Sequence, residues 1–130
     1  SKDWINQRLK SIEVRKELTD EWAERGVKEG FEYGILTNEI TKAWTGKTVK
    51  ELKELKGLKK QNLRDNMDNL ELVLNMLAEA STTEISKVRK PKGLGENKKV
   101  AKDGGGVAKK AKEDIELKIG KSVLGKNNPH

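Results

Sequence analysis

The stretch that decides the fold is DWINQRLKSIEVRKELTDEWAER, residues 3–25, which contains no proline or glycine and is followed by Gly26. Such a run predicts one long helix that ends at the glycine. At about 100° per residue, its apolar side chains form two stripes on nearly opposite sides of the helix. One stripe comprises Ile5, Leu9 and Ile12, and the other comprises Trp4, Val14, Leu18 and Trp22.

A helix with two apolar stripes needs two packing partners. Either both partners belong to the same fold, or one side of the helix packs internally and the other packs against a second copy of the chain. For the second arrangement, a dimer, the stripe with the two tryptophans is the candidate self-association surface.

The rest of the chain predicts further helices and no strands. Thr37 is a candidate cap for a short helix that ends at Gly46, and Thr48 with Glu51 forms a capping box for another that ends at Gly57. Leucines at helical spacing predict a core helix over residues 62–80, and a second capping box at Ser81 predicts a short helix towards Pro91.

The C-terminal part of the chain is expected to be a loop at residues 90–98, then a helical stripe to Ile119, then an irregular tail from Gly120. Three glycines, Gly104 to Gly106, either break this last helix or allow close packing. The predicted fold is therefore all-α, a single bundle of about five to seven helices. Residues 1–90 form the helical core, and residues 91–130 form a basic helical segment that packs on it or on a partner.

Composition excludes many kinds of chemistry. The chain has no cysteine, and its single histidine is His130. Thiol nucleophiles, disulfides, most zinc sites and histidine base catalysis are therefore unavailable or disfavoured, and we expect neither an enzyme nor a cofactor. No apolar run approaches eighteen residues and no signal peptide is evident, so we expect a soluble, cytoplasmic protein without a membrane partner.

The net charge of +7 is concentrated at one end of the chain. Residues 1–86 contain 15 basic and 16 acidic side chains, whereas residues 87–130 contain 13 basic and 5 acidic ones. An anionic partner would be attracted to this last third. The candidate nucleic-acid contacts are Lys87, Arg89, Lys90, Lys92, Lys98, Lys99, Lys102, Lys109, Lys110 and Lys112. Few aromatic residues lie nearby to stack on bases, so a purely solvating role stays open.

Three other patterns have a structural interpretation that we favour over a functional one. The helices predicted at 37–45 and 48–56 have helix-turn-helix spacing, but the second presents lysine and glutamate rather than base-reading side chains. Asp65, Asp68 and Glu71 could suggest a magnesium site, but Asp65 and Asp68 point away from the leucine stripe into solvent. Gly104 to Gly106 lack the spacing of a phosphate-binding loop.

Three stretches together carry a family resemblance: INQRLKSIEVRKELTDEWAERG (5–26), GILTNEITKAWTGKTVKELKELKGLKKQNLRDNMDNLELVLNMLAEASTTEIS (34–86) and ENKKVAKDGGGVAKKAKEDIE (96–116). They resemble the DNA-damage-inducible protein D family of bacteria. The likeness is to the C-terminal region of that family, without the BRO-type domain that usually precedes it. It implies association with the SOS response and restraint of recombinase filaments on single-stranded DNA. It implies no catalytic residues.

These observations lead to two functional hypotheses. The first is a non-enzymatic helical interaction domain that self-associates and regulates DNA repair or recombinase filaments through protein contacts. The alternative is a direct, non-specific and weak DNA-binding module that uses the C-terminal lysines. One departure from the resemblance bears on the alternative, because Lys109, Lys110 and Lys112 make the stretch after the glycines more basic than is usual in the family.

Overall fold

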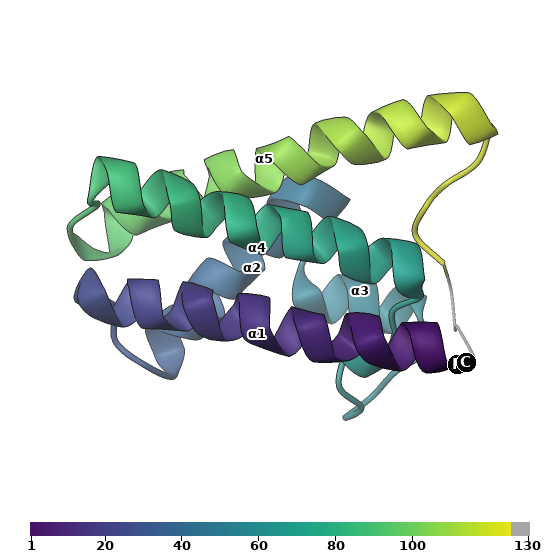
Figure 1. Cartoon of the computed structure of the whole chain (residues 1–130), viewed down its shortest axis with the longest axis horizontal. Coiled ribbons are helices and arrows are strands. Elements are labelled where there is room, and N and C mark those ends of the chain that lie inside the picture. Colours follow the sequence, from purple (N-terminus) through teal and green to yellow (C-terminus); the bar gives the residue numbers. More distant parts are fainter. Residues whose placement is uncertain (126–130) are drawn as a thin grey trace.

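The computed structural model describes residues 1–125, and within this range the fold is all-helical. Five α-helices and one short 3-10 helix follow one another along the chain (Figure 1). Their bounds are α1 Lys2–Glu24, α2 Phe31–Thr45, α3 Val49–Leu55, η1 Arg64–Asn66, α4 Asn69–Arg89 and α5 Gly93–Ile119. The all-α prediction and the long N-terminal helix are confirmed.

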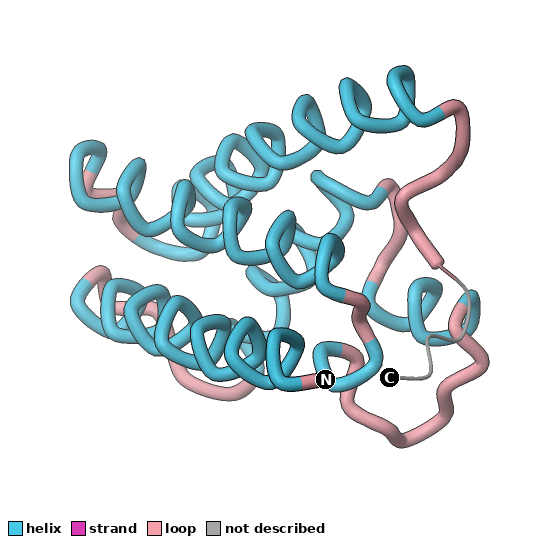
Figure 2. Tube along the Cα trace, turned by 45° about the vertical axis from the view of Figure 1, so that its right-hand side comes forward, coloured by secondary structure: helices cyan, strands magenta, loops and turns pink. Residues whose placement is uncertain are grey.

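Helices α1 and α4 lie side by side and run in the same direction (Figure 1). Hydrogen bonds join them in register, from the Trp4 indole to the Met67 carbonyl just before α4 and from Ser86 to Glu21 near the other end. Because neighbouring parallel helices need a long connection, the chain between them returns through α2, α3 and the long loop that contains η1 (Figure 2). Helix α5 then folds back antiparallel to α4 and packs against both α4 and α2.

The hydrophobic core lies where α1, α2, α4 and α5 meet. Its largest side chains are Trp22 of α1 and Trp44 of α2, both about 1% exposed. The Trp44 indole nitrogen donates to the Asn75 amide oxygen of α4 at 3.2 Å, which satisfies a polar group that would otherwise be costly to bury. Leu18, Leu36, Leu52 and Leu72 complete the centre of the core.

The bounds of the central helix differ from the prediction. Residues 62–68 form a loop with η1, and the helix begins after Asp68, which accepts from the Glu71 amide while Glu71 accepts from the Asp68 amide. Helix α4 then continues through Ser81, where a new helix was expected. The Thr82 and Thr83 hydroxyls bond carbonyls one turn back within the helix, so these polar residues do not end it.

Helix α5 runs without a break through its three glycines, which settles the choice between a break and close packing. A Cβ at Gly104 would overlap Thr82 of α4, and a Cβ at Gly105 would lie 2.7 Å from the Ile40 carbonyl oxygen of α2. The two glycines therefore let α5 approach both neighbouring helices closely. The helix also starts at Gly93, so the predicted loop at 90–98 shrinks to the three residues 90–92.

Candidate functional site

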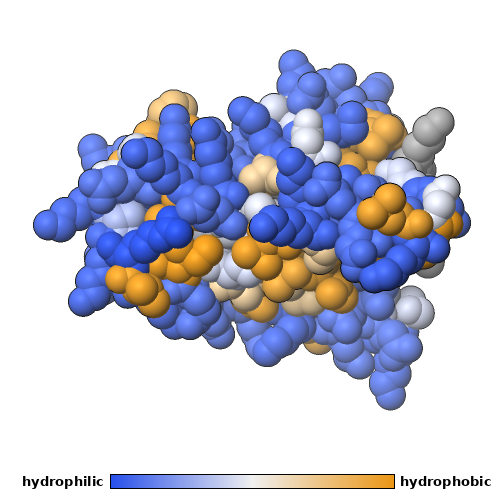
Figure 3. All heavy atoms as spheres, turned by 90° about the horizontal axis from the view of Figure 1, so that it is seen from above, coloured by the Kyte–Doolittle hydropathy of each residue, from blue (hydrophilic) through white to orange (hydrophobic). Residues whose placement is uncertain are grey.

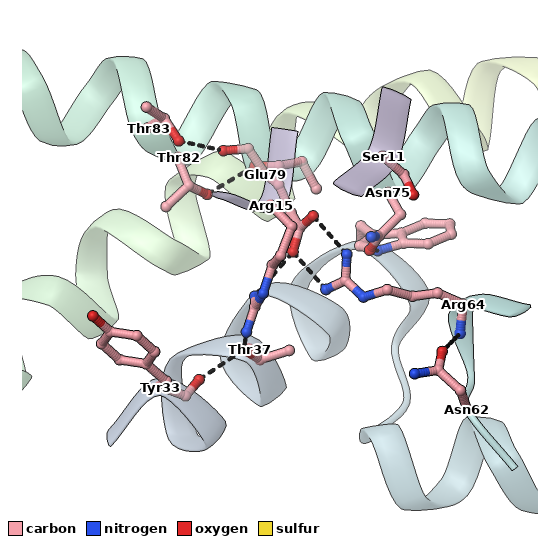
Figure 4. A network of polar contacts seen from close by, with 12 residues as sticks. Ser11, Arg15, Tyr33, Thr37, Asn62, Arg64, Asn75, Glu79, Thr82 and Thr83 are labelled. Atoms are coloured by element: carbon pink, nitrogen blue, oxygen red, sulfur yellow. Dashed lines mark hydrogen bonds and ion pairs between the residues drawn. The ribbon is translucent and has the colours of Figure 1, made fainter. Parts of the chain in front are cut away.

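A cluster of charged side chains joins α1, α2, η1 and α4 (Figure 4). At its centre is Glu79 of α4, whose side chain is only 1% exposed. Glu79 accepts from Arg15 of α1 at 3.0 Å and from two nitrogens of Arg64 at 2.8 and 2.6 Å. Arg15 also donates to the Thr37 hydroxyl of α2 at 2.8 Å, and its guanidinium lies 5.1 Å from the centroid of the Trp22 ring. Two cations thus share one buried anion.

Burial and the Glu79 carboxylate act in opposite directions on the two arginines. Burial lowers the pKa of Arg15, and the attraction of Glu79 only partly offsets this. Burial also lowers the pKa of Arg64, but its hydrogen bonds to Glu79 and the carboxylate charge outweigh this, so the pKa of Arg64 is raised. Both guanidiniums stay charged, and the cluster acts as a clamp between segments that are distant in sequence.

A hollow of about 720 Å³ lies beside this clamp, between α1, α2 and α3. Its walls combine basic, polar and apolar side chains, with Glu54 as the one acidic group among them. The lining residues are Arg15, Gly34, Thr37, Asn38, Val49, Lys50, Lys53, Glu54, Leu58 and Lys59. The hollow holds no pair of carboxylates and no nucleophile next to a base, so its lining offers no catalytic arrangement.

The acidic residues considered for magnesium are engaged within the fold. Asp65 pairs with Arg8 at 2.8 Å, and Asp68 caps α4. Glu71 completes that cap and forms an ion pair at 2.8 Å with Lys56, both side chains being fully buried. Across residues 1–125 there is no group of three or more histidine, cysteine, aspartate or glutamate side chains placed to hold a metal ion.

The four residues predicted for self-association pack within the chain. Leu18 and Trp22 are buried, and Trp4 and Val14 are partly buried. The opposite stripe of α1 is the one left open, because Ile5, Leu9 and Ile12 are 53%, 57% and 51% exposed. Two stripes exist as predicted, but the one available to a partner is the stripe without tryptophan. Self-association itself stays a prediction.

A second exposed apolar surface lies over α4 and α5, on another part of the molecule. Seen from above, apolar side chains form an interrupted band across this face (Figure 3). The exposed members, here called the α4–α5 band, are Leu70, Val73, Leu77, Val107 and Ile119. Each is between 37% and 49% exposed. Leu70, Val73 and Leu77 recur at intervals of three and four residues, which places them on one side of α4.

The ten candidate nucleic-acid contacts divide into three groups. Three of them are engaged in ion pairs, since Lys87 pairs with Glu84, Arg89 with Asp103 and Lys112 with Glu116. Lys90 and Lys92 lie in the turn between α4 and α5. The remaining five lie along α5 and form no ion pair with any residue in the described range. These five, here called the lysine face, are Lys98, Lys99, Lys102, Lys109 and Lys110.

The lysine face follows from helical periodicity. Lys98, Lys102 and Lys109 recur at intervals of four and seven residues, which places them on one side of α5. Gly105, seven residues after Lys98, lies at the edge of this side where α5 contacts α2, whereas Gly104 points towards α4. Four of the five side chains are exposed and Lys98 is half-buried, so the structure brings together half of the predicted contacts.

Sequence reasoning missed the clamp of Arg15, Arg64 and Glu79. A signal was present, because Arg8 and Arg15 fall on the same side of α1 as Trp4 and Trp22. A charged residue inside an apolar stripe indicates a buried partner of opposite charge. The identity of that partner could not be inferred, because Glu79 and Arg64 come from elements whose packing is set by the tertiary fold.

Comparison with known proteins addresses identity. No curated protein matches the chain. No helix in residues 1–125 is both long and apolar enough to cross a membrane. The model of the DinD C-terminal domain matches residues 4–123, which include all five helices apart from the first two residues of α1. This match connects the chain with proteins of the DNA-damage response, as the sequence resemblance implied. The chain belongs to the DinD C-terminal domain family.

Proposed function

We propose that this chain is a self-associating, protein-docking domain of a DNA-damage-related protein. The observation that supports this most directly is the exposed stripe of Ile5, Leu9 and Ile12 on a helix whose other side is already packed. Three large aliphatic side chains, each about half in water, lie on consecutive turns. Covering them is favourable, since complete burial of such a side chain contributes about 1.5–3 kcal/mol.

The order of the three residues suits a two-fold pair. Ile, Leu and Ile at positions 5, 9 and 12 read nearly the same in both directions along the helix. If two copies of α1 lie antiparallel, Leu9 meets Leu9 of the second copy, and Ile5 meets Ile12 of the second copy. A closed dimer requires this kind of self-complementary surface. Because the stripe is short, we expect a reversible dimer rather than an obligate one.

The α4–α5 band would remain free in such a dimer, since it lies on other helices. We propose that it binds a second protein, and that the recombinase filament implied by the sequence resemblance is that partner. Aliphatic anchors on two packed helices suit a helical or flat apolar partner surface. Dimerisation would present two such bands at once, which raises the effective affinity for a filament with repeating subunits.

Light scattering over a concentration series tests the self-association. Wild-type chain should approach the mass of a dimer as concentration rises, whereas Leu9→Lys should remain a monomer because two lysines would meet at the centre of the interface. Val88→Lys is the matched control, since Val88 is 82% exposed in the last turn of α4 and is not part of the α1 stripe. A wild-type chain that stays monomeric at every soluble concentration would remove the proposal.

Assembly of recombinase filaments on single-stranded DNA tests the second surface. Wild-type chain should change the rate or extent of assembly, and Leu77→Lys should abolish that effect while leaving the thermal unfolding curve nearly unchanged. Leu117→Lys serves as control, because Leu117 is 84% exposed on α5 and lies outside the band. If both variants act like wild type, the band is not the contact surface.

A further inference from the structure

Gly106 is a glycine that the fold does not need. Gly104 and Gly105 allow close packing, but a Cβ at Gly106 would have no atom within 4 Å, and the backbone there is helical without a positive φ. Gly106 also lies near the middle of α5, where glycine destabilises a helix relative to alanine. Neither packing nor backbone conformation therefore accounts for it.

The surroundings of Gly106 form a shallow saddle across the helix. A hollow of about 250 Å³ is lined by Lys102, Asp103, Gly106, Val107 and Lys110. Another, of about 440 Å³, is lined by Glu39, Lys42, Ala43, Lys102, Gly106 and Lys109. Lys102 and Gly106 line both hollows. Because glycine has no side chain, no side chain of residue 106 separates the two hollows where they meet. We call this region the Gly106 saddle.

The saddle is strongly cationic. Four lysines surround it, namely Lys42, Lys102, Lys109 and Lys110, against two carboxylates. One of these carboxylates, Asp103, is paired with Arg89 and adds little net negative charge. Lys98 and Lys99 extend the same side of α5 towards its N-terminus. From Lys99 to Lys110 the helix rises about 16 Å, which equals the axial rise of about five phosphates of one strand in a DNA duplex.

We propose that the Gly106 saddle binds the sugar-phosphate backbone of a nucleic acid, with one phosphate lying directly over Gly106. The bare helix backbone lets the phosphate approach closely, and Lys102 and Lys109 contact it from either side. The neighbouring lysines contact the phosphates before and after it. No aromatic side chain occurs on α5 to stack on a base, so the contact is independent of base sequence.

A phosphate backbone fits this surface better than an acidic protein does. Protein interfaces depend on buried apolar or aromatic anchors at their centre, and the centre here is a glycine flanked by lysines. Phosphate contacts need no such anchor and gain from each lysine through release of bound counterions. The site lies apart from the stripe of α1 and shares only Val107 with the α4–α5 band, so this inference goes beyond the protein-docking function and stands without it.

Titration of the whole chain into fluorescently labelled oligothymidylate and into a labelled duplex, with anisotropy as readout, tests the inference. Wild-type chain should bind, and the logarithm of its affinity should fall linearly with the logarithm of salt concentration. Lys102→Gln combined with Lys109→Gln should weaken binding and reduce that slope by about two. Gly106→Leu should weaken binding by about tenfold with every charge retained, because the side chain displaces the central phosphate.

Stability separates this effect from a folding defect. Gly106→Leu should raise the melting temperature, since leucine replaces an unconstrained glycine in a helix, while it lowers affinity. Gly34→Leu is the matched control. Gly34 is another helical glycine with open space around it, but it lies in the first turns of α2 and lines the hollow of about 720 Å³ beside the Arg15–Arg64–Glu79 clamp. It should leave binding unchanged.

Three results would overturn the inference. Wild-type chain that fails to bind either nucleic acid at low salt removes the site altogether. Full affinity in Gly106→Leu, with loss in the lysine variant, shows that the lysines bind without the saddle. Competition by polyglutamate as effective as that by unlabelled DNA identifies an acidic protein surface as the occupant.

Discussion

Arg64 and Glu79 form a bidentate ion pair, in which Nη1 lies 2.8 Å from Oε1 and Nη2 lies 2.6 Å from Oε2. Paired hydrogen bonds between a guanidinium and a carboxylate are among the strongest polar contacts in proteins. Arg64 belongs to the short turn η1, whereas Glu79 lies in the middle of α4, so the pair fixes an otherwise irregular loop against the bundle. Arg15 approaches the same carboxylate from α1.

Replacing Glu79 should therefore be strongly destabilising. In Glu79→Gln the carboxylate charge is lost and two partly buried guanidiniums face each other without a counterion, which should lower the free energy of unfolding by about 3 kcal/mol. Urea denaturation measures this. Asp20→Asn is the control, because the Lys16–Asp20 pair is exposed and its loss should change stability by less than about 0.5 kcal/mol. Equal effects of the two variants would contradict the role given to the clamp.

The buried pair of Lys56 and Glu71 allows a second test. Lys56 donates to Glu71 at 2.8 Å and to the Gly125 carbonyl at 3.0 Å, with neither side chain exposed. Lys56→Met leaves a buried carboxylate without its cation and should cost about 3 kcal/mol. Adding Glu71→Gln removes that charge but keeps an oxygen for the Asp68 amide, so the double variant should recover at least half of the loss. A double variant less stable than the single one would show that the charges are not coupled.

The adjacent glycines of α5 should respond to alanine in opposite directions. Gly104→Ala places a methyl group against Thr82, only 2.7 Å from its backbone Cα, and should destabilise the fold by at least about 1–3 kcal/mol. Gly106→Ala meets no neighbour and should stabilise it by about 0.5–1 kcal/mol. Thermal unfolding of the two variants side by side measures the difference. Similar melting temperatures would mean that α5 packs less closely on α4 than described.

Docking of the segment after α5 should depend on pH. A hydrogen bond from the Val123 amide, helped by Lys112, lowers the pKa of Glu116 despite partial desolvation. A carboxyl whose folded pKa is lowered stabilises the docked state above its unfolded pKa, about 4.3, and this contribution is lost as the pH falls through the folded value. Hydrogen exchange at the Val123 amide should therefore accelerate on acidification below about pH 4.3.

Glu116→Gln provides the control for this experiment. Glutamine still offers an oxygen to the Val123 amide but does not titrate, so exchange in the variant should lose its dependence on carboxyl protonation. The intrinsic pH dependence of amide exchange is removed by reference to an amide in the middle of α4. If wild type and variant follow the same profile, Glu116 does not hold the segment in place.

Helix positions could largely be predicted from sequence because periodicity and capping are local. Residues 3–25 predict one helix, as α1 shows, and the Thr48–Glu51 capping box correctly predicts the start of α3. The predicted cap at Thr37 is wrong, because α2 already begins at Phe31. The predicted start of α4 is too early, since Leu63 and Met67 continue the leucine spacing. Both are buried, but they reach the core from the loop around η1. The spacing of the apolar residues therefore predicts correctly that Leu63 and Met67 are buried, but predicts wrongly that they lie in a helix.

The spacing of residues in the sequence does not show which helix surfaces and side chains contact one another in the fold. Both stripes of α1 were identified, yet spacing alone cannot tell which one faces α4 and which faces solvent. The same limit applies to the basic residues of the C-terminal third, because their spacing does not show that Arg89 forms an ion pair with Asp103, a residue on another helix. The glycines show the same limit. Three identical residues in a row have three different environments, and only the packing of α2 and α4 around α5 distinguishes Gly106 from its neighbours.

The parallel arrangement of α1 and α4 has a consequence for how the protein is made. The contacts that join Trp4, Arg15 and Glu21 to their partners span 63 to 65 residues of sequence. At roughly 5–20 residues per second, a ribosome releases α4 several seconds after α1. Until then the tryptophan side of α1 can contact α2 but lacks α4. The nascent chain therefore passes through an interval in which part of the apolar surface of α1 is uncovered.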